Sequence, residues 1–139
     1  FMEQSCIFCK IAQGNIPSST IYEDDMFRVI LDLSPAARGH ALVLPKEHFR
    51  NIFDIDDKTA SKLFVVAAKV ARAMKESLGC DGMNIVQNNE EIAGQTVFHF
   101  HLHIIPRYKD DGQTIAWNPG SAEPDELKEI TAKIKAALK

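Results

Sequence analysis

Histidines alternate with apolar residues in the segment His99-Phe100-His101-Leu102-His103, and this pattern constrains the fold more than any other. Side chains alternate across a β-strand, so a strand over residues 97–105 would present all three histidines on one face. The intervening apolar side chains would then point into the core. Three buried imidazoles need hydrogen-bond partners for every ring nitrogen, which makes a functional site a better explanation than chance. The segment therefore predicts a strand with a transition-metal site or a phosphate site on its polar face.

The residues that precede this strand favour phosphate chemistry over a transition metal. Gly94-Gln95-Thr96 combines a turn, an amide and a hydroxyl group, and Asn88 lies a few residues earlier. Such groups can hold phosphate oxygens or a leaving group, but they are poor ligands for soft transition metals. An imidazole is partly neutral near pH 7 and can then attack phosphorus as a nucleophile.

The rest of the chain predicts an α+β fold, in which one long helix packs on an antiparallel sheet of about five strands. The connections between the early strands are short, which favours antiparallel pairing. Besides residues 97–105, apolar and β-branched runs bounded by turn residues predict four strands: Thr20–Glu23, Phe27–Asp32, His40–Leu44 and Met83–Gln87.

Three helices are expected. The long helix covers about Lys58–Leu78, where apolar residues recur at three- and four-residue steps and Gly79 follows the end. A short N-terminal helix over Cys6–Gln13 ends at Gly14, and a C-terminal helical extension begins after Pro124. The apolar residues of this extension recur on one side: Leu127, Ile130, Ile134 and Leu138.

Length and charge narrow the class of protein. The 139 residues predict one domain over residues 2–139, with a core over about 6–107 and a tail over 108–139. Phe1 precedes Met2 and is expected to derive from an expression vector. The net charge of −3 argues against a protein that grips nucleic acid through phosphate neutralisation. The sequence has no apolar stretch of membrane-spanning length and no signal-peptide pattern, so we expect no membrane association and a cytoplasmic location.

The cysteines leave two interpretations open. Cys6, Cys9 and Cys80 are an odd number in a chain without an export signal, so metal binding or burial is expected in place of a disulfide framework. The Cys6-Ile7-Phe8-Cys9 motif has little room before it for the strand that usually precedes a redox pair. As half of a tetrahedral metal site, the motif needs two further ligands.

The segment Gly94–Ile105 resembles the signature of the histidine triad (HIT) family, in which three histidines alternate with apolar residues. Further segments resemble the Hint-like, bacterial-type branch of this family: Ile16-Pro17, Tyr22–Asp25, Asp32, Gly39–Lys46 and His48. The resemblance extends from about residue 6 to residue 107. It implies a HIT-like α+β fold and the activity of a nucleotide hydrolase or transferase.

The resemblance also implies a catalytic role for particular residues. His101 would attack the α-phosphate of a purine nucleoside 5′-phosphate derivative, such as a phosphoramidate or an acyl-adenylate. The resulting nucleotidyl-histidine would react with water and release the nucleoside monophosphate. His40 and His103 would flank the phosphate, and Gln95 and Thr96 would contact the phosphate and the leaving group. Many Hint-like members have serine where this chain has Thr96.

The same resemblance implies a nucleotide-binding set. Asp32 would accept hydrogen bonds from the ribose hydroxyls, and Asn88, Gly94 and Val97 would border the phosphate. An apolar slot for the base would be formed by residues that are also ordinary core candidates: Phe8, Ile11, Ile16 and Leu33.

Cofactor and partners are implied in the same way. Some bacterial-type Hint-like proteins carry structural zinc on a CxxC motif and two histidines, which here correspond to Cys6, Cys9, His48 and His99. No organic cofactor is expected. Hint-like proteins form homodimers, so a homodimer is expected, with no nucleic acid or membrane partner.

Three alternatives stay open. The same site architecture serves dinucleoside polyphosphate hydrolases, which differ in the leaving group. A nucleotide-binding interaction protein would hydrolyse slowly and hold nucleoside monophosphate tightly. A metal-binding module would bind metal through His101 and form no phosphohistidine.

Overall fold

The structure is a computed structural model that describes residues 3–139, so the expected origin of Phe1 concerns a residue outside the described part. In this described part, five antiparallel strands form one sheet in the order β1-β2-β3-β5-β4. The strands are β1 (Thr20–Glu23), β2 (Phe27–Leu31), β3 (Ala41–Pro45), β4 (Gly82–Val86) and β5 (Leu102–Arg107). Together with the three α-helices of residues 3–139, this sheet confirms the α+β prediction.

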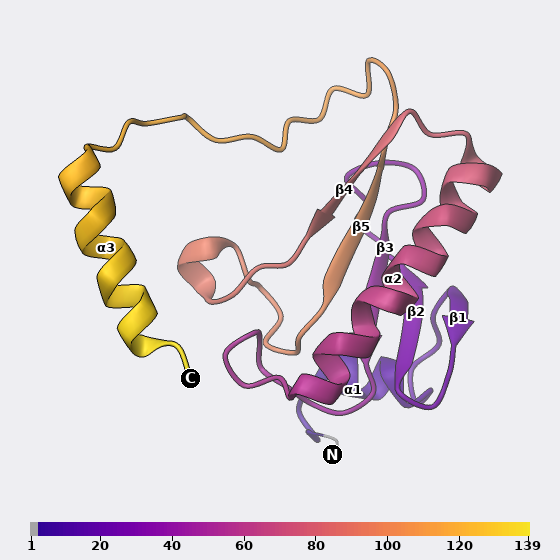
Figure 1. The fold of residues 1–139 in the computed structure, drawn as a ribbon. Coiled ribbons are helices and arrows are strands. Elements are labelled where there is room, and N and C mark those ends of the chain that lie inside the picture. The colour runs from indigo at the N-terminus through magenta and orange to yellow at the C-terminus, as the bar shows by residue number, and fades with distance from the viewer. Residues whose placement is uncertain (1–2) are drawn as a thin grey trace.

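The alternation of side chains along β2 and β3 gives the sheet two apolar faces, each covered by a helix. Val29 and Val43 belong to the main core beneath α2 (Asp57–Leu78), whose buried face includes Leu63. Residues of opposite parity on the same strands form a smaller cluster with α1 (Ile7–Ala12): Ile30, Leu42 and Leu44. Helix α2 runs along one face of the sheet in Figure 1. The two helices therefore lie on opposite faces.

Both ends of α2 follow from local chemistry. The Asp56 carboxylate accepts a hydrogen bond from the Thr59 backbone N–H at 2.7 Å, which satisfies an unpaired donor of the first turn. Gly79 ends the helix in the left-handed conformation, at φ +64°, where glycine is favoured. These bounds confirm the predicted helix to within one residue.

The predicted strand over residues 97–105 is wrong in its bounds, because β5 begins only at Leu102. The β3–β5 ladder ends at the pair Val43 and Leu102, and Pro45 further along β3 has no N–H to donate. The preceding residues hydrogen-bond elsewhere: the Phe100 N–H donates to the Phe49 carbonyl at 2.7 Å. Even so, Phe100 and Leu102 pack in the main core as predicted, so the alternation of side chains continues through the irregular segment.

The C-terminal extension forms α3 (Pro124–Ala137), and Figure 1 shows it away from the sheet at the end of an extended segment. None of its residues, all of which the structure describes, is buried. Between β4 and β5 a short 3₁₀ turn, η1, covers Glu91–Ala93. Among residues 3–139, no helix has both the length and the apolar character needed to cross a membrane.

Candidate active site

A pocket of about 710 Å³ lies on the sheet face that α1 covers, within the size range of small-molecule sites. Its walls come from α1, the following loop, the end of β2 and the segment before β5. The lining residues are Ile7, Phe8, Ile11, Pro17, Ser18, Ser19, Ile30, Leu31, Asp32, Leu33, Ser34, Leu42, Thr96, Val97, His101 and His103. Another pocket, of about 670 Å³, lies beside β1 and α2, but its described lining contains no histidine or cysteine. The first pocket, which includes His101 and His103, is therefore the candidate active site.

The structure brings most of the predicted site residues together and leaves several outside. Eight line the pocket: Phe8, Ile11, Asp32, Leu33, Thr96, Val97, His101 and His103. His40 contacts His103 from behind the lining, at 2.9 Å between ring nitrogens. Ile16, Asn88, Gly94 and Gln95 are not among the lining residues. Asn88 lies against Gly94, where an added Cβ would approach its amide nitrogen to 3.4 Å.

The geometry around His101 defines which ring nitrogen is available. Its Nδ1 lies 2.7 Å from the His99 backbone carbonyl, and a carbonyl oxygen can only accept, so Nδ1 carries a proton. In the neutral ring the Nε2 atom then keeps a free electron pair. The ring of Phe8 packs edge-on against the His101 ring, with 5.0 Å between the ring centroids. His101 is thus a buried imidazole with one oriented nucleophilic nitrogen.

A separate series of hydrogen bonds orients the rings of His40 and His103. The Ala36 N–H donates to His40 Nδ1 at 2.9 Å, so Nε2 carries the proton of the neutral His40 ring. This Nε2 atom lies 2.9 Å from His103 Nδ1 and 3.6 Å from the Asp32 carboxylate. His103 Nδ1 is therefore an acceptor, and its Nε2–H is a donor. The pocket therefore contains one imidazole whose Nε2 can attack and one whose Nε2–H can donate a hydrogen bond.

Burial keeps these rings neutral at pH 7. It lowers the pKa of His101 and of His40 from the ordinary value, and the charge of Asp32 offsets part of either shift. Burial, with the neighbouring charges of His101 and His40, lowers the pKa of His103 to about 4. Neutral imidazole is the form that acts as a nucleophile, so these shifts favour phosphorus chemistry near neutral pH.

The four predicted metal ligands also come together. One ligand atom from each of Cys6, Cys9, His48 and His99 lies within 4.8 Å of the others. His99 Nδ1 is 3.4 Å from both sulfur atoms, and Cys9 Sγ is 3.3 Å from His48 Nδ1. A tetrahedral zinc ion, with Zn–S of about 2.3 Å and Zn–N of about 2.0 Å, would separate sulfur and nitrogen by roughly 3.5 Å.

The orientation of His99 fits the same purpose. Its Nε2 donates to the Pro45 carbonyl at 2.8 Å, which leaves the Nδ1 electron pair directed at the cysteines. Burial lowers the pKa of His99 to about 4 and raises the pKa of Cys9 to about 11. A cation at this group would therefore displace a thiol proton and bind a neutral imidazole. The residues present fit a metal ion with S₂N₂ coordination.

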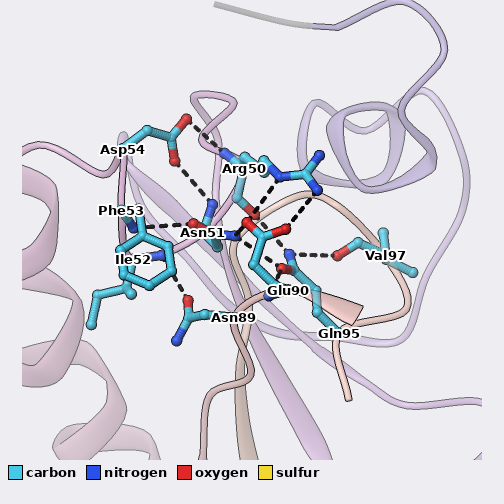
Figure 2. Close-up of polar contacts among 9 residues, drawn as sticks. All are labelled: Arg50, Asn51, Ile52, Phe53, Asp54, Asn89, Glu90, Gln95 and Val97. Carbon is cyan, nitrogen blue, oxygen red and sulfur yellow. Dashed lines mark hydrogen bonds and ion pairs between the residues drawn. The ribbon is translucent and has the colours of Figure 1, made fainter. Parts of the chain in front are cut away.

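Gln95 occupies a different place from the one that the sequence suggested. Its side chain is 2% exposed and uses both ends of the amide internally. The amide nitrogen donates to the Arg50 and Val97 carbonyls at 2.8 and 3.1 Å. The amide oxygen accepts from the Glu90 backbone N–H and from Asn51, at 2.8 and 3.1 Å (Figure 2). Contact of this side chain with a phosphate would require breaking these bonds.

Several lining residues were missed from the sequence. Ile7 lies one helical turn before Ile11, so the i, i+4 spacing could have assigned both to one face of α1. Ser18 and Ser19 follow Ile16-Pro17 and line the pocket through the loop after α1. Nothing in the residue pattern of that loop indicates that it folds back toward β2.

A family model and known proteins match most of this chain. The model of the HIT domain matches residues 13–110. Protein hit of Bacillus subtilis is 42% identical over 138 residues, which cover 97% of this chain and 95% of that protein. Adenosine 5′-monophosphoramidase hnt1 of Schizosaccharomyces pombe is 36% identical over 136 residues, which cover 97% and 99%.

Solved structures of histidine triad family proteins also match this chain. The crystal structure of a HIT family member from Bacillus subtilis matches with a TM-score of 0.93 at 41% identity, and covers 98% of this chain and 99% of that chain. A zinc-bound histidine triad family protein from Mycobacterium smegmatis matches with a TM-score of 0.76 at 40% identity, and covers 96% and 98%.

The lowered pKa of His103 makes stability depend on pH. In the unfolded chain a histidine binds its proton near pH 6.5, whereas in the folded chain His103 binds it only near pH 4. The unfolded state therefore binds more protons, and the free energy of unfolding falls as the pH decreases from about 6.5 to about 4. We expect His103→Asn to reduce this fall, measured by urea unfolding at pH 7 and pH 5. An NMR titration of the His103 ring with a midpoint near 6.5 would contradict the assignment.

Proposed function

Because this chain belongs to the HIT family, we propose that it hydrolyses purine nucleoside 5′-phosphate derivatives at the α-phosphate, with phosphoramidates and acyl-adenylates as the substrate class. The nucleophile is His101 and the product is the nucleoside monophosphate. Relatives named adenosine 5′-monophosphoramidase support hydrolase activity in this family. The observation that carries the proposal is the hydrogen bond from His101 Nδ1 to the His99 carbonyl, since it leaves Nε2 free to attack.

The reaction takes two steps. First, a bond forms between His101 Nε2 and the α-phosphorus, the bond from phosphorus to the leaving nitrogen breaks, and the departing amine takes a proton from a water molecule. Second, the oxygen of the hydroxide that remains bonds to phosphorus, and the phosphorus–His101 bond breaks. His103 stays neutral through both steps, and its Nε2–H donates a hydrogen bond to a phosphate oxygen. The His99 carbonyl stabilises the positive charge that His101 carries in the intermediate.

The shape and polarity of the pocket support a nucleoside monophosphate group. The apolar walls from α1 and β2 match a purine base, and Asp32 on the loop after β2 is placed to accept ribose hydroxyls. The Asp32 backbone is itself held by hydrogen bonds, since its N–H donates to the His40 carbonyl at 2.8 Å. Thr96 and Val97 form the wall beside the histidines, where the phosphate and its leaving group would lie.

We expect His101→Ala and His101→Gly to lose at least ~10³-fold in the rate of AMP release from an adenosine phosphoramidate, because no other group in the pocket replaces the nucleophile. A fluorescent amine as leaving group reports the rate, and AMP binding by calorimetry controls for an intact pocket. Diadenosine tetraphosphate in a parallel assay tests the polyphosphate alternative. If the wild-type protein binds AMP but hydrolyses neither substrate, the protein binds nucleotides and is not a hydrolase of these compounds. Unchanged rates in both variants would exclude His101 as the nucleophile.

Zinc is the proposed occupant of the group formed by Cys6, Cys9, His48 and His99. The S₂N₂ donor set suits zinc, and the zinc-bound relative from Mycobacterium smegmatis supports the choice. Bound zinc would link α1 and the loop that carries His48 to the segment before β5. Its four ligands are not among the residues that line the pocket, so its proposed role is structural.

We expect one zinc ion per chain by elemental analysis, and Cys9→Ser should abolish most of it. Removal of zinc by chelation should lower the melting temperature by ~5 °C or more, because an ion that binds only the folded state stabilises it. Cys80→Ser is the matched control, since Cys80 is also buried but lies outside the group. Equal zinc content in the two variants would refute the site.

A homodimer is the proposed assembly. Strand β4 is at the edge of the sheet, so one side of its backbone has no strand partner among the described residues. Ile85 on this strand is 40% exposed, and Phe64 on α2 is 59% exposed. A second copy could pair with the open edge and cover apolar side chains of this kind.

We expect the wild-type protein to sediment as a dimer in analytical ultracentrifugation and Ile85→Lys to sediment as a monomer at the same concentration. A lysine on an edge strand opposes pairing because it places a charge at the contact. Ile92→Lys is the control, because Ile92 is 98% exposed on η1 and away from the strand. A monomeric wild type would exclude the dimer, and a dimeric Ile85→Lys would exclude this edge.

A further inference from the structure

Glu90 has a backbone conformation that glutamate rarely adopts. It lies at φ +74° and ψ +158°, in a region that is essentially restricted to glycine. The surrounding structure must hold such a residue in place, and strain of this kind is concentrated at functional sites. Glu90 directly precedes η1 and the segment that leads to the catalytic histidines.

The Glu90 carboxylate is held from two directions. Arg50 donates to it through Nη2 at 2.8 Å and Nε at 3.3 Å, and the buried Asn51 amide donates at 2.7 Å (Figure 2). These bonds lower the pKa of Glu90 to about 2. The carboxylate is therefore charged throughout the neutral range and fixed by charge-assisted hydrogen bonds.

The Glu90 backbone is held as firmly as its side chain. Its N–H donates to the Gln95 amide oxygen at 2.8 Å, and its carbonyl accepts from the Ala93 and Gln95 N–H groups at 3.1 Å. Asn51 also donates to the Gln95 amide oxygen. The Gln95 amide nitrogen donates in turn to the Arg50 backbone carbonyl at 2.8 Å, which closes a ring of four residues through side-chain and backbone groups. We call this ring of Arg50, Asn51, Glu90 and Gln95 the Glu90 clamp (Figure 2).

The Glu90 clamp is hydrogen-bonded directly to the pocket wall. The Gln95 amide nitrogen donates to the Val97 carbonyl, and Thr96 and Val97 line the pocket beside His101. The Arg50 guanidinium also lies 4.3 Å from the ring of Phe98. The wall segment, residues 95–98, lies outside the strands, and the clamp supplies hydrogen-bond partners for the Gln95 N–H and the Val97 carbonyl.

We propose that Glu90 is a positioning residue for the reaction proposed above. The clamp fixes the wall segment so that Thr96 and Val97 meet the phosphate in the orientation that attack by His101 requires. Glycine would adopt the same backbone without strain, but it has no carboxylate to bind Arg50 and Asn51. Glu90 therefore keeps a strained backbone together with the charged carboxylate whose hydrogen bonds order the wall segment. This inference rests on the proposed hydrolase function.

Two substitutions separate positioning from stability. Glu90→Gly and Glu90→Ala both remove the carboxylate, but only alanine keeps the backbone strain. We expect Glu90→Gly to have the higher melting temperature of the two, and both to lose ~10- to 100-fold in kcat, because small displacements of a reacting group cost this much. KM should change less than ~3-fold, since the base and ribose contacts lie on other elements. Glu90→Gln, which keeps an acceptor oxygen, should recover part of kcat.

The matched control is Glu23→Ala. The Glu23 carboxylate also binds two cations, Arg28 and Lys46, at 2.7 and 2.8 Å, but Glu23 does not line the pocket. Its kcat should equal that of the wild type. The proposal is overturned if kcat follows the melting temperature across the Glu90 variants, or if Glu90→Gly keeps wild-type kcat.

Amide hydrogen exchange gives a readout that does not depend on activity. Glu90→Gly should exchange faster than the wild type at residues 95–98, with exchange in β2 and β3 unchanged. Unchanged exchange at residues 95–98 overturns the proposal. A wild type with no hydrolase activity would refute the proposed function, while this measurement would still decide whether the clamp orders the wall.

Discussion

The hydrogen bonds made by residues 99–101 outside any strand connect the two halves of the site. His99 donates through Nε2 to the Pro45 carbonyl at the end of β3, and its own carbonyl accepts from His101 Nδ1. One residue thereby directs a ring nitrogen at the cysteine pair and fixes the tautomer of the residue placed to attack. If this segment continued the β5 ladder, the His99 carbonyl would face a neighbouring strand and could not hold His101.

Backbone groups set the tautomers of His40, His99 and His101, because an N–H can only donate a hydrogen bond and a carbonyl can only accept one. The Ala36 N–H makes His40 Nδ1 an acceptor, and the two carbonyls make His101 Nδ1 and His99 Nε2 donors. Burial then keeps the rings neutral, since it disfavours the charged form of each imidazole. Neutral rings alone would be ambiguous between tautomers, and hydrogen bonds alone would not prevent protonation. The site needs both.

The parts of this structure that the sequence predicts are those governed by periodic patterns. The apolar period of α2, the glycine that follows its end and the alternation at Phe100 and Leu102 can be read from the sequence, and the structure agrees with them. The start of β5 could not be predicted, because it depends on where β3 stops offering hydrogen bonds. The position of Gln95 was not predictable either, since its partners Arg50 and Asn51 are about 45 residues away in sequence. Family resemblance assigned residue types to the site, whereas hydrogen bonds between distant segments decide what each side chain contacts.

A segment that leaves the sheet must satisfy its backbone by other means, and this requirement explains the clustering of unusual features between residues 90 and 101. Carbonyls of Pro45 and Phe49 hold its end near His99 and Phe100. At the other end, no strand is available, and a charged carboxylate on a strained backbone holds Gln95. Irregular backbone lets side chains converge on a pocket in directions that a regular strand cannot provide. The accompanying cost is a set of specific buried contacts, each of which must be complete for the pocket wall to keep its shape.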